Sequence, residues 1–290
     1  MQLSVIVPCY DAERTLGEQL EALAGQTWSG DWEVIIADNG PPRARGALEA
    51  LLGRYRERLP NLRRVEAAAR RGAGHARNEG ARAARGALLA FVDADDVVAE
   101  GWLEAVAAAL GAHDFVASRH GFERLNSAQT LASRHNEQSE GLQGYYYPPF
   151  LPHAGGCGLA IKRTLHEAVG GFDESFLRLQ DTDYCWRVQL AGTPLVFAPA
   201  ALVHVRYRSS AKSILRQARE NGEANVHLHK TYRARGMPPL SLRQGLFAWL
   251  GILRTLPHLA DPERRGHWLW QFGWRLGRLR GSLTYRIVSL

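Results

Sequence analysis

The sequence predicts an α/β fold, in which a mostly parallel central sheet is flanked by helices and followed by a C-terminal helical extension. Short apolar runs alternate with amphipathic segments through the first hundred residues, as in successive βαβ units. Beyond residue 206 the pattern is amphipathic and helical to the last residue. With 290 residues, of which 46% are hydrophobic, the chain can bury a full-sized core.

The predicted strands are short apolar runs that end in polar residues. LSVIVPCY at residues 3–10 and WEVIIADNG at 32–40 are apolar at nearly every position, which is typical of strands buried on both faces. We expect further strands at residues 63–69, 87–96, 114–122 and 194–205. The polar residues that close three of these strands are Pro8 to Asp11, Asp38 with Asn39, and Asp93 to Asp96. Because ligands bind at the carboxyl ends of parallel strands, these residues predict a site at one rim of the sheet.

The predicted helices separate these strands. Residues 15–25 place Leu16, Leu20 and Leu23 on one helical face, which is the pattern of an amphipathic helix. We expect the other helices at residues 43–59, 78–84, 101–111 and 181–191. Residues 124–150 are first polar and then aromatic, so they predict a loop region. Its YYYPPF stretch either stacks on a sugar face or simply packs as a loop.

The positive charge is concentrated near the C-terminus. The net charge is +7, and the last fifty residues contain eight arginines but only two acidic residues. The rest of the chain is close to neutral, which argues against a nucleic-acid partner. Lysine occurs at only three positions while alanine is abundant, which suggests a GC-rich, bacterial genome.

The cysteines and the lengths of the apolar runs indicate the cellular compartment of the protein. Cys9, Cys157 and Cys185 lack the spacing of a metal site or a disulfide framework, which favours a reducing compartment. No secretory leader precedes the first strand, and no apolar run approaches the roughly 18 residues of a membrane span. We therefore expect a cytoplasmic protein, with peripheral contact at the inner face of the membrane left open.

An acidic triplet follows the fourth predicted strand. Asp93 and Asp95 stand at i and i+2, so their carboxylates can point to the same side of the loop. Their hard oxygens suit Mg²⁺ or Mn²⁺ and leave coordination positions for phosphate oxygens. The alternative is that Asp96 caps the following helix.

Three further features have both a chemical and a structural interpretation. Asp181 and Asp183 begin a helix, where one carboxylate could deprotonate an acceptor hydroxyl or both could serve as helix caps. His204 ends the last strand, either as a structural residue or as a metal ligand. Gly72 to Asn78 follow a strand and open a helix, but Arg77 occupies the place of the third glycine of a Rossmann motif. These residues could still face a phosphate group.

Taken together, these segments resemble the family-2 glycosyltransferases over roughly residues 1–205. SVIVPCYDAERTL resembles the family's opening strand, with Asp11 where asparagine is usual. EVIIADNG resembles the strand whose paired acids hold the nucleotide base, with Asn39 in place of the second acid. The resemblance implies that the donor is bound in this half by Pro8, Tyr10, Asp11, Asp38 and Asn39.

The middle of the chain continues the resemblance. GAGHARNEG resembles the segment in which Arg77 and Asn78 approach the donor phosphates. FVDADD resembles the family's DxD motif, in which Asp93 would face the ribose or the metal and Asp95 the metal. Gly156 lies in a glycine-rich stretch that we expect to form a wall of the sugar pocket, because glycine permits close approach.

The resemblance also covers the acceptor side. GGFDESF and LQDTDYCWR resemble the family's acceptor-side signature, with Asp181 at the position of the base and Gln180 in place of a glutamate. ALVHV resembles the strand whose His204 can complete a metal site. The implied metal ligands are therefore Asp93, Asp95 and His204, and the implied cofactor is Mn²⁺ or Mg²⁺.

The resemblance implies a glycosyltransferase-A (GT-A) fold and an inverting reaction. We expect a catalytic domain at residues 1–205, with a nucleotide-binding half at 1–100 and an acceptor half at 101–205, and a C-terminal helical extension at 206–290. A sugar would pass from a nucleotide-diphosphate donor, UDP-sugars being among the candidates, by metal-assisted direct displacement with Asp181 as base. The acceptor is left open among a glycan, a lipid-linked acceptor and a natural product.

The C-terminal segment at residues 241–290 has two interpretations. It contains four of the eight tryptophans, interleaved with arginine: Trp249, Trp268, Trp270 and Trp274. In one interpretation it lies on a membrane, with tryptophan at the interface and arginine toward anionic lipid. In the other, these helices pack on the catalytic domain or on a second subunit and keep arginine outward.

Two other functional classes remain as alternatives. A nucleotidyltransferase would need a glycine-rich, basic loop after the first strand, where PCYDAERTL offers only Arg14. A non-catalytic nucleotide-sugar-binding or glycan-binding protein with a decayed site is supported by Asn39 and Gln180. Against it stand the three carboxylates assigned above to the metal and the base.

Overall fold

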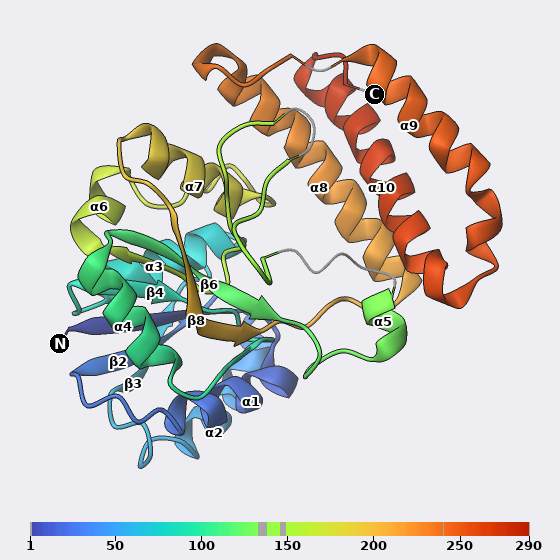
Figure 1. Cartoon of the computed structure of the whole chain (residues 1–290). Helices are drawn as coiled ribbons and strands as arrows, with labels where there is room; N and C mark the ends of the chain where they lie inside the picture. The colour runs from blue at the N-terminus through green and yellow to red at the C-terminus, as the bar shows by residue number, and fades with distance from the viewer. Residues whose placement is uncertain (1, 133–137, 146–148, 240, 290) are drawn as a thin grey trace. The chain divides into compact units, whose positions relative to one another are not determined.

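The computed structural model describes residues 2–132, 138–145, 149–239 and 241–289, and the chain forms two compact units (Figure 1). Unit 1 comprises Met1–Arg124, Glu137–Gln143 and Pro152–Arg206. Unit 2 comprises Leu125–Asn136, Gly144–Leu151 and Tyr207–Leu290. The change from unit 1 to unit 2 after Arg206 falls one residue from the predicted boundary, but unit 2 also takes two segments of the predicted loop region.

Unit 1 contains one eight-stranded sheet with the order β3-β2-β1-β4-β7-β6-β8-β5. Its strands are β1 (Leu3–Cys9), β2 (Trp32–Asp38), β3 (Leu62–Glu66), β4 (Leu88–Phe91), β5 (Val97–Val98), β6 (Phe115–Gly121), β7 (Leu159–Lys162) and β8 (Val196–His204). The pairs β3–β2, β2–β1, β1–β4 and β6–β8 are parallel, whereas β7 and β5 run against their neighbours. The predicted α/β fold with a mostly parallel sheet is therefore confirmed.

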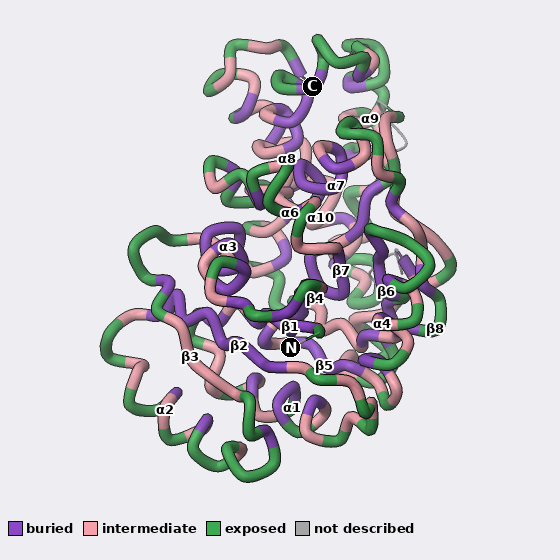
Figure 2. The backbone as a smooth tube through the Cα atoms, turned by 90° about the vertical axis from the view of Figure 1, so that its left-hand side faces the viewer, coloured by how far each residue is buried: buried purple, intermediate pink, exposed green. Residues whose placement is uncertain are grey.

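Helices cover both faces of this sheet (Figure 1), and strands β1, β2, β4 and β7 are mostly buried, whereas the edge strand β3 is only partly buried (Figure 2). The helices of unit 1 are α1 (Glu13–Ala24), η1 (Pro42–Ala44), α2 (Arg45–Gly53), α3 (Ala73–Ala83), α4 (Trp102–Ala112), α6 (Arg163–Ala168) and α7 (Gln180–Leu190). Alternate residues of β1 serve the two faces: Val5 and Val7 pack with Leu16 of α1, and Ile6 packs with Phe91 and Tyr184 of the other face. This alternation follows from the two-residue period of a strand.

The strand register brings the polar strand ends to one rim of the sheet. Cys9, the last residue of β1, is paired with Asp38, the last residue of β2. Gly121 at the end of β6 is paired with His204 at the end of β8. Asp93 closely follows β4, which lies beside β1. The rim that the sequence predicted is therefore formed.

Some predicted elements differ from those observed. The helix expected at residues 43–59 is a short 3-10 turn followed by α2, which ends at Gly53, and Arg58 and Leu59 then bond back to Tyr55 in tight turns. Residues 124–150 include α5 (Ala128–Ala132) in the predicted loop region. The two-residue strand β5 and the one-and-a-half-turn helix α6 were not predicted, because they are too short to show a period. Of the YYYPPF stretch, residues 146–148 lie outside the described residues.

Unit 2 is helical, as the sequence predicted. Its helices are α5, α8 (Ala211–Tyr232), η2 (Arg233–Arg235), α9 (Leu242–Arg254), η3 (Leu256–Leu259) and α10 (Pro262–Tyr285). Glycines bring α8 and α10 into backbone contact: a Cβ added at Gly277 would clash with the carbonyl oxygen of Arg219, and one at Gly222 would clash with that of Trp274. Among the described helices, none is both long and apolar enough to cross a membrane.

Candidate active site

The loop after β4 presents two carboxylates on its open side. Asp93 and Asp95 are partly exposed, whereas the alternate residues Ala94 and Asp96 are buried. The side chain of Asp93 is 34% exposed. Both acids therefore reach solvent from the same loop, and the expectation that their carboxylates point to the same side stays a prediction.

A buried arginine lies beside Asp93 and joins two parts of the site. The Nη2 atom of Arg77, in α3, donates to Oδ1 of Asp93 at 2.6 Å, although the side chain of Arg77 is only 2% exposed. Its guanidinium lies directly below Gly156, since a Cβ added there would be 2.5 Å from Nη2. The same cation interacts electrostatically with Asp181. Arg77 thus connects the acids of the β4 loop with the acid at the start of α7.

Asp181 lies at the positive end of α7 and accepts two backbone hydrogen bonds. Its Oδ2 accepts from Gly156 N at 2.9 Å and its Oδ1 from Thr182 N at 2.9 Å. Burial raises the pKa of Asp181, while Arg77 and the two N–H donors oppose that shift. A carboxylate with a raised pKa is better matched to proton transfer at neutral pH than an ordinary one.

The helix-capping alternatives for the acids are not what the structure shows. The residue at the N-cap of α7 is Leu179, and no side chain caps that helix. Asp183 is buried and pairs with Arg187 at 2.8 Å, which is a structural contact. Asp96 accepts from the backbone N–H of Arg206 at 2.8 Å and so fixes the end of β8.

Asp96 also belongs to a buried cluster. Asp93, Asp96 and Cys157 form the one group of potential ligand side chains, among the described residues, whose ligand atoms all lie within 4.8 Å of one another. Burial raises the pKa of Asp96 and of Cys157 well above their ordinary values, and the neighbouring acids add to both shifts. Burial therefore disfavours the charged form of both groups, whereas Asp93 is partly exposed and can offer an oxygen to a metal.

The predicted metal ligands are only partly brought together. Of the three, only Asp93 belongs to the group of close ligand atoms found among the described residues; Asp95 and His204 are outside it, so a metal role for Asp95 stays a prediction. His204 ends β8, opposite Val97 of β5, and burial lowers its pKa so that its ring is neutral. Within the described part of the chain, its Nδ1 atom is buried without a hydrogen-bond partner. A metal role for His204 stays a prediction.

At the end of β2, Asp38 and Asn39 already hold neighbouring loops. Asp38 is 3% exposed and accepts from Gly40 N at 2.9 Å and from Arg64 Nε at 2.8 Å. Asn39 donates to the carbonyl oxygens of Ala67 and Arg70, and it accepts from Gly72 N at 3.0 Å. An aspartate could not make the two donated bonds, so the departure from a paired acid at this position has a structural reason.

The segment after β1 is open to solvent. Tyr10 is 50% exposed, and the guanidinium of Arg71 lies 5.4 Å from the centre of its ring. Asp11 has a φ of 52°, a left-handed conformation that asparagine and aspartate tolerate better than most residues. Pro8 lies inside β1, paired with Ala37. The ring of Tyr10 is half exposed, and its stacking on a nucleotide base stays a prediction.

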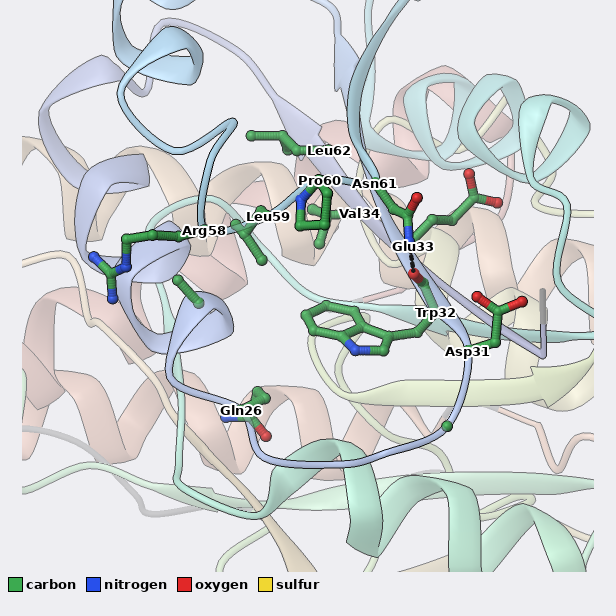
Figure 3. Close-up of a pocket in the computed structure, with 12 residues that line it drawn as sticks. Gln26, Asp31, Trp32, Glu33, Val34, Arg58, Leu59, Pro60, Asn61 and Leu62 are labelled. Carbon is green, nitrogen blue, oxygen red and sulfur yellow. Dashed lines mark hydrogen bonds between the residues drawn. The ribbon is translucent and has the colours of Figure 1, made fainter.

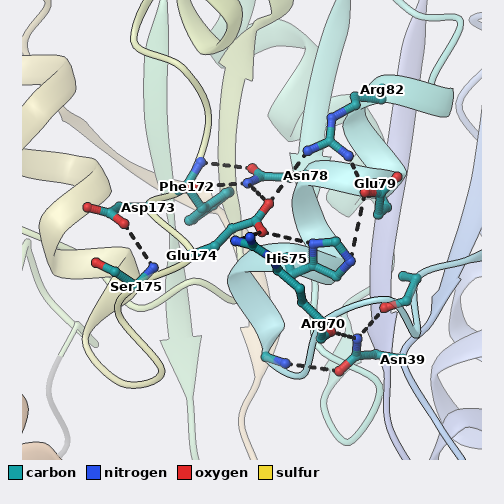
Figure 4. Close-up of polar contacts among 12 residues, drawn as sticks. Asn39, Arg70, His75, Asn78, Glu79, Arg82, Phe172, Asp173, Glu174 and Ser175 are labelled. Carbon is teal, nitrogen blue, oxygen red and sulfur yellow. Dashed lines mark hydrogen bonds and ion pairs between the residues drawn. The ribbon is translucent and has the colours of Figure 1, made fainter.

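Asn78 has a structural position that the sequence did not predict (Figure 4). It donates to Phe172 O at 2.9 Å and to Glu174 Oε1 at 3.0 Å, and it accepts from Phe172 N at 2.8 Å. Glu174 also contacts His75 Nδ1 at 3.0 Å. The amide of Asn78 therefore clamps the loop before α7 onto α3, and a contact with donor phosphates stays a prediction.

Two pockets lie on unit 1. One, of about 620 Å³, is lined by the residues around the Asn78 clamp, among them Arg70, Arg82 and Arg187. The other, of about 260 Å³, lies where β2 begins and is lined by Trp32, Leu59 and their neighbours (Figure 3). That second pocket is at the amino end of β2, opposite the rim that carries the acids, so it has no part in the candidate site.

The sequence did not reveal every residue of the site. Three contacts of the site join positions that are far apart in the chain. Arg77 is buried beneath Gly156, the guanidinium of Arg71 lies over the ring of Tyr10, and Asp96 bonds to the end of β8. Only the motif order gave a signal, since GAGHARNEG and GGFDESF are both part of the pattern that the sequence shares with the glycosyltransferases.

Comparison with known proteins identifies the family. The sequence profile of the family described as "Glycosyl transferase family 2" matches residues 4–170, which is more than half of the chain. The chain belongs to this family. The match runs from β1 through the β4 loop and the glycine-rich stretch to α6, so it includes Asp93, Arg77 and Gly156.

Two relatives of this family 2 glycosyltransferase differ in how much of each chain they share. A "Pre-mycofactocin glycosyltransferase" of Mycobacterium tuberculosis is 30% identical over 204 residues, which cover 62% of this chain and 40% of the relative. "Glycosyltransferase AglE" of Haloferax volcanii is 26% identical over 270 residues, which cover 91% of this chain and 85% of the relative. The chain thus spans less than half the length of some relatives that it matches.

Solved structures show the fold. A mannosyltransferase, PcManGT from Pyrobaculum calidifontis in complex with GDP-Man and Mn²⁺, superposes with a TM-score of 0.63 at 19% identity, covering 97% of this chain and 86% of that one. S. aureus TarS in complex with UDP-GlcNAc superposes with a TM-score of 0.57 at 18% identity, covering 99% of this chain and 92% of that one. The predicted GT-A fold of this family 2 glycosyltransferase is therefore confirmed.

Proposed function

We propose that this chain is an inverting glycosyltransferase that transfers a sugar from a nucleotide-diphosphate donor to a hydroxyl acceptor. Family membership and fold support sugar transfer. The arrangement of Asp93, Arg77 and Asp181 at one rim supports the inverting mechanism, because direct displacement needs one group for the leaving diphosphate and another for the attacking hydroxyl.

On the donor side, the rim offers both an aromatic ring and carboxylates. Tyr10 would stack on the base, and the open side of the β4 loop would face the diphosphate. Asp93 and Asp95 would hold a divalent cation, and they fit one because both are hard oxygen donors that are partly exposed. His204 would add a neutral nitrogen from β8. When bound, such a cation supplies positive charge that stabilises the departing diphosphate.

On the acceptor side, Asp181 would act as the base. The acceptor hydroxyl transfers its proton to a carboxylate oxygen of Asp181 while the hydroxyl oxygen attacks the anomeric carbon. The bond from that carbon to the diphosphate oxygen breaks, and a single displacement of this kind inverts the anomeric centre. Gly156 N and Thr182 N, which already donate to Asp181, orient its carboxylate for this role.

Arg77 would act as a positioning residue rather than as a phosphate ligand. Its guanidinium is covered by Gly156 and is bound to Asp93, while its charge also faces Asp181. The position of the Arg77 guanidinium between Asp93 and Asp181 is the single observation that carries the proposal. It joins the donor-side acid to the acceptor-side acid, which is far away in the sequence.

Calorimetry on the full chain tests the donor assignment. We expect UDP, GDP or TDP to bind, and the preferred diphosphate to bind about tenfold or more tightly with Mn²⁺ than without it. Asp95→Asn should remove the Mn²⁺-dependent part of the affinity. Asp114→Asn is the matched control, because Asp114 is an exposed acid before β6, at the opposite end of the strands, where it pairs with Lys162. Equal binding with and without Mn²⁺ in both variants and the parent chain would overturn the assignment.

A further inference from the structure

Helix α9 of unit 2 carries an exposed apolar face. Five of its large apolar side chains, together with the first residue of η3, are between 47% and 65% exposed. These residues, called the α9 face below, are Leu242, Leu246, Phe247, Leu250, Leu253 and Leu256. Apart from the adjacent pair Leu246 and Phe247, the five within α9 are three or four residues apart, which places them on one half of the helix. So many large apolar side chains on one helical face are unusual for a surface that only water covers.

Helix α9 is held against α10 by Ile252 and, along the border of the α9 face, by Trp249. Ile252 is buried, and its carbonyl oxygen accepts from Trp268 Nε1 at 3.1 Å. The rings of Trp249 and Phe272 meet edge to face at 6.2 Å. The side chain of Ser241 caps the helix by accepting from Gln244 N. The α9 face is therefore presented by a helix that is anchored within its own unit.

The tryptophans are not the residues that the chain exposes here. Trp268 is buried, and Trp249, Trp270 and Trp274 are only partly exposed. The interpretation that placed tryptophan at a membrane interface therefore has little exposed ring area to support it, and it stays a prediction. The aliphatic side chains of α9 occupy the exposed position instead.

The stretch of chain that contains α9 carries charge of one sign. No acidic residue occurs between Ala224 and Ala260, and five lysines and arginines do. Arg243 lies at the edge of the face, with its guanidinium 5.6 Å from the ring centre of Phe247. Arg254 is exposed in the last turn of the helix. An apolar helix face with cations along its edge is complementary to the interface of a membrane that contains anionic lipid.

We propose that the α9 face is a docking surface for a bilayer with anionic headgroups. The apolar side chains enter the boundary between headgroups and acyl chains, and Arg243 and Arg254 contact the anionic groups. A second copy of the chain fits this surface less well, because a symmetric contact would place Arg243 and Arg254 of one copy close to the same cations of the other without an acid to pair with them.

Vesicle flotation of the full chain tests this docking. We expect binding to vesicles of phosphatidylglycerol and phosphatidylcholine in equal parts and weaker binding to phosphatidylcholine alone. Leu246→Glu with Leu250→Glu should lower binding by about tenfold or more for each leucine. Arg243→Gln with Arg254→Gln should lower binding to the anionic vesicles and leave binding to phosphatidylcholine unchanged. Leu283→Glu is the matched control, because Leu283 is 84% exposed on α10 but lies outside the α9 face.

Circular dichroism confirms that each variant is folded, and Leu253→Gln, at the most exposed position of the face, gives a milder variant if the double change unfolds. Equal flotation of the parent chain and the α9 variants would overturn the proposal, as would no flotation of the parent chain. Light scattering in the absence of vesicles measures whether a second copy of the chain covers the α9 face. A dimer that dissociates on Leu246→Glu, in a chain that does not float, would assign the face to a second copy.

Discussion

Replacing Gly156 by alanine tests the packing that joins the two acids of the site. The added Cβ would lie 2.5, 2.7 and 2.8 Å from Nη2, Cζ and Nη1 of Arg77. Ordinary contact begins near 3.4 Å, so the guanidinium would have to move by about 0.9 Å. With only 2% of its side chain exposed and one donor bound to Asp93, Arg77 has little room to do so.

We expect Gly156→Ala to cost about 1–3 kcal/mol of stability, as overpacking does in other cores. We also expect donor turnover to fall by about 100-fold, because a displacement near 1 Å misplaces Asp93 and Asp181 together. Urea denaturation measures the first effect, and the rate of nucleotide-sugar hydrolysis measures the second. Gly141→Ala is the matched control, since a Cβ there meets nothing within 4 Å. Stability and turnover within twofold of the parent chain for Gly156→Ala would refute this reasoning.

Three other predictions concern the scaffold. Asn39→Asp should weaken donor binding and destabilise the chain by about 1–3 kcal/mol in urea denaturation, since an aspartate oxygen would then face two carbonyl groups. Unchanged binding and stability would show that the hydrogen bonds of Asn39 do not hold its neighbouring loops. Burial lowers the pKa of His166 from 6.5 to about 4, so its contribution to stability is complete above pH 6.5 and is lost as the pH falls toward 4. Between pH 7.5 and 5, the unfolding free energy should therefore fall by about 2 kcal/mol more in the parent chain than in His166→Gln, and parallel curves would exclude this group. Gly277→Ala should lower the melting temperature through its clash with α8, whereas Gly251→Ala, with open space at its Cβ, should not; equal melting temperatures would mean that the two helices separate at little cost.

Local patterns in the sequence predicted the sheet and the position of the acids. The apolar runs predicted the buried strands, and the polar residues that close them predicted the rim. Asp93 and Asp95, the two acids that the sequence expected on one side of the loop, are both partly exposed, while Ala94 and Asp96 are buried. These features depend on periods of a few residues, which a single sequence displays directly.

Contacts between distant segments could not be predicted in the same way. Arg77 was expected at a phosphate because it stands in a glycine-rich motif, yet its side chain is covered by Gly156, far along the chain. Asn39 was interpreted as a departure from a base-binding acid, yet its amide holds the loop that ends at Gly72. Such roles follow from tertiary packing, which decides where a polar side chain finds its partners.

The central claim is that Asp93 and Asp181, on either side of the Arg77 guanidinium, serve the leaving diphosphate and the attacking hydroxyl. The variant Asp181→Asn tests this claim most directly. The account predicts that this variant binds the nucleotide-sugar donor with the affinity of the parent chain in calorimetry, because Asp181 lies on the acceptor side. The substitution removes the proton acceptor together with one of the two backbone hydrogen bonds that Asp181 accepts. It also predicts that donor turnover falls by about 100-fold or more, the range that general bases contribute. Parent-level turnover in a variant that binds the donor normally would contradict the account.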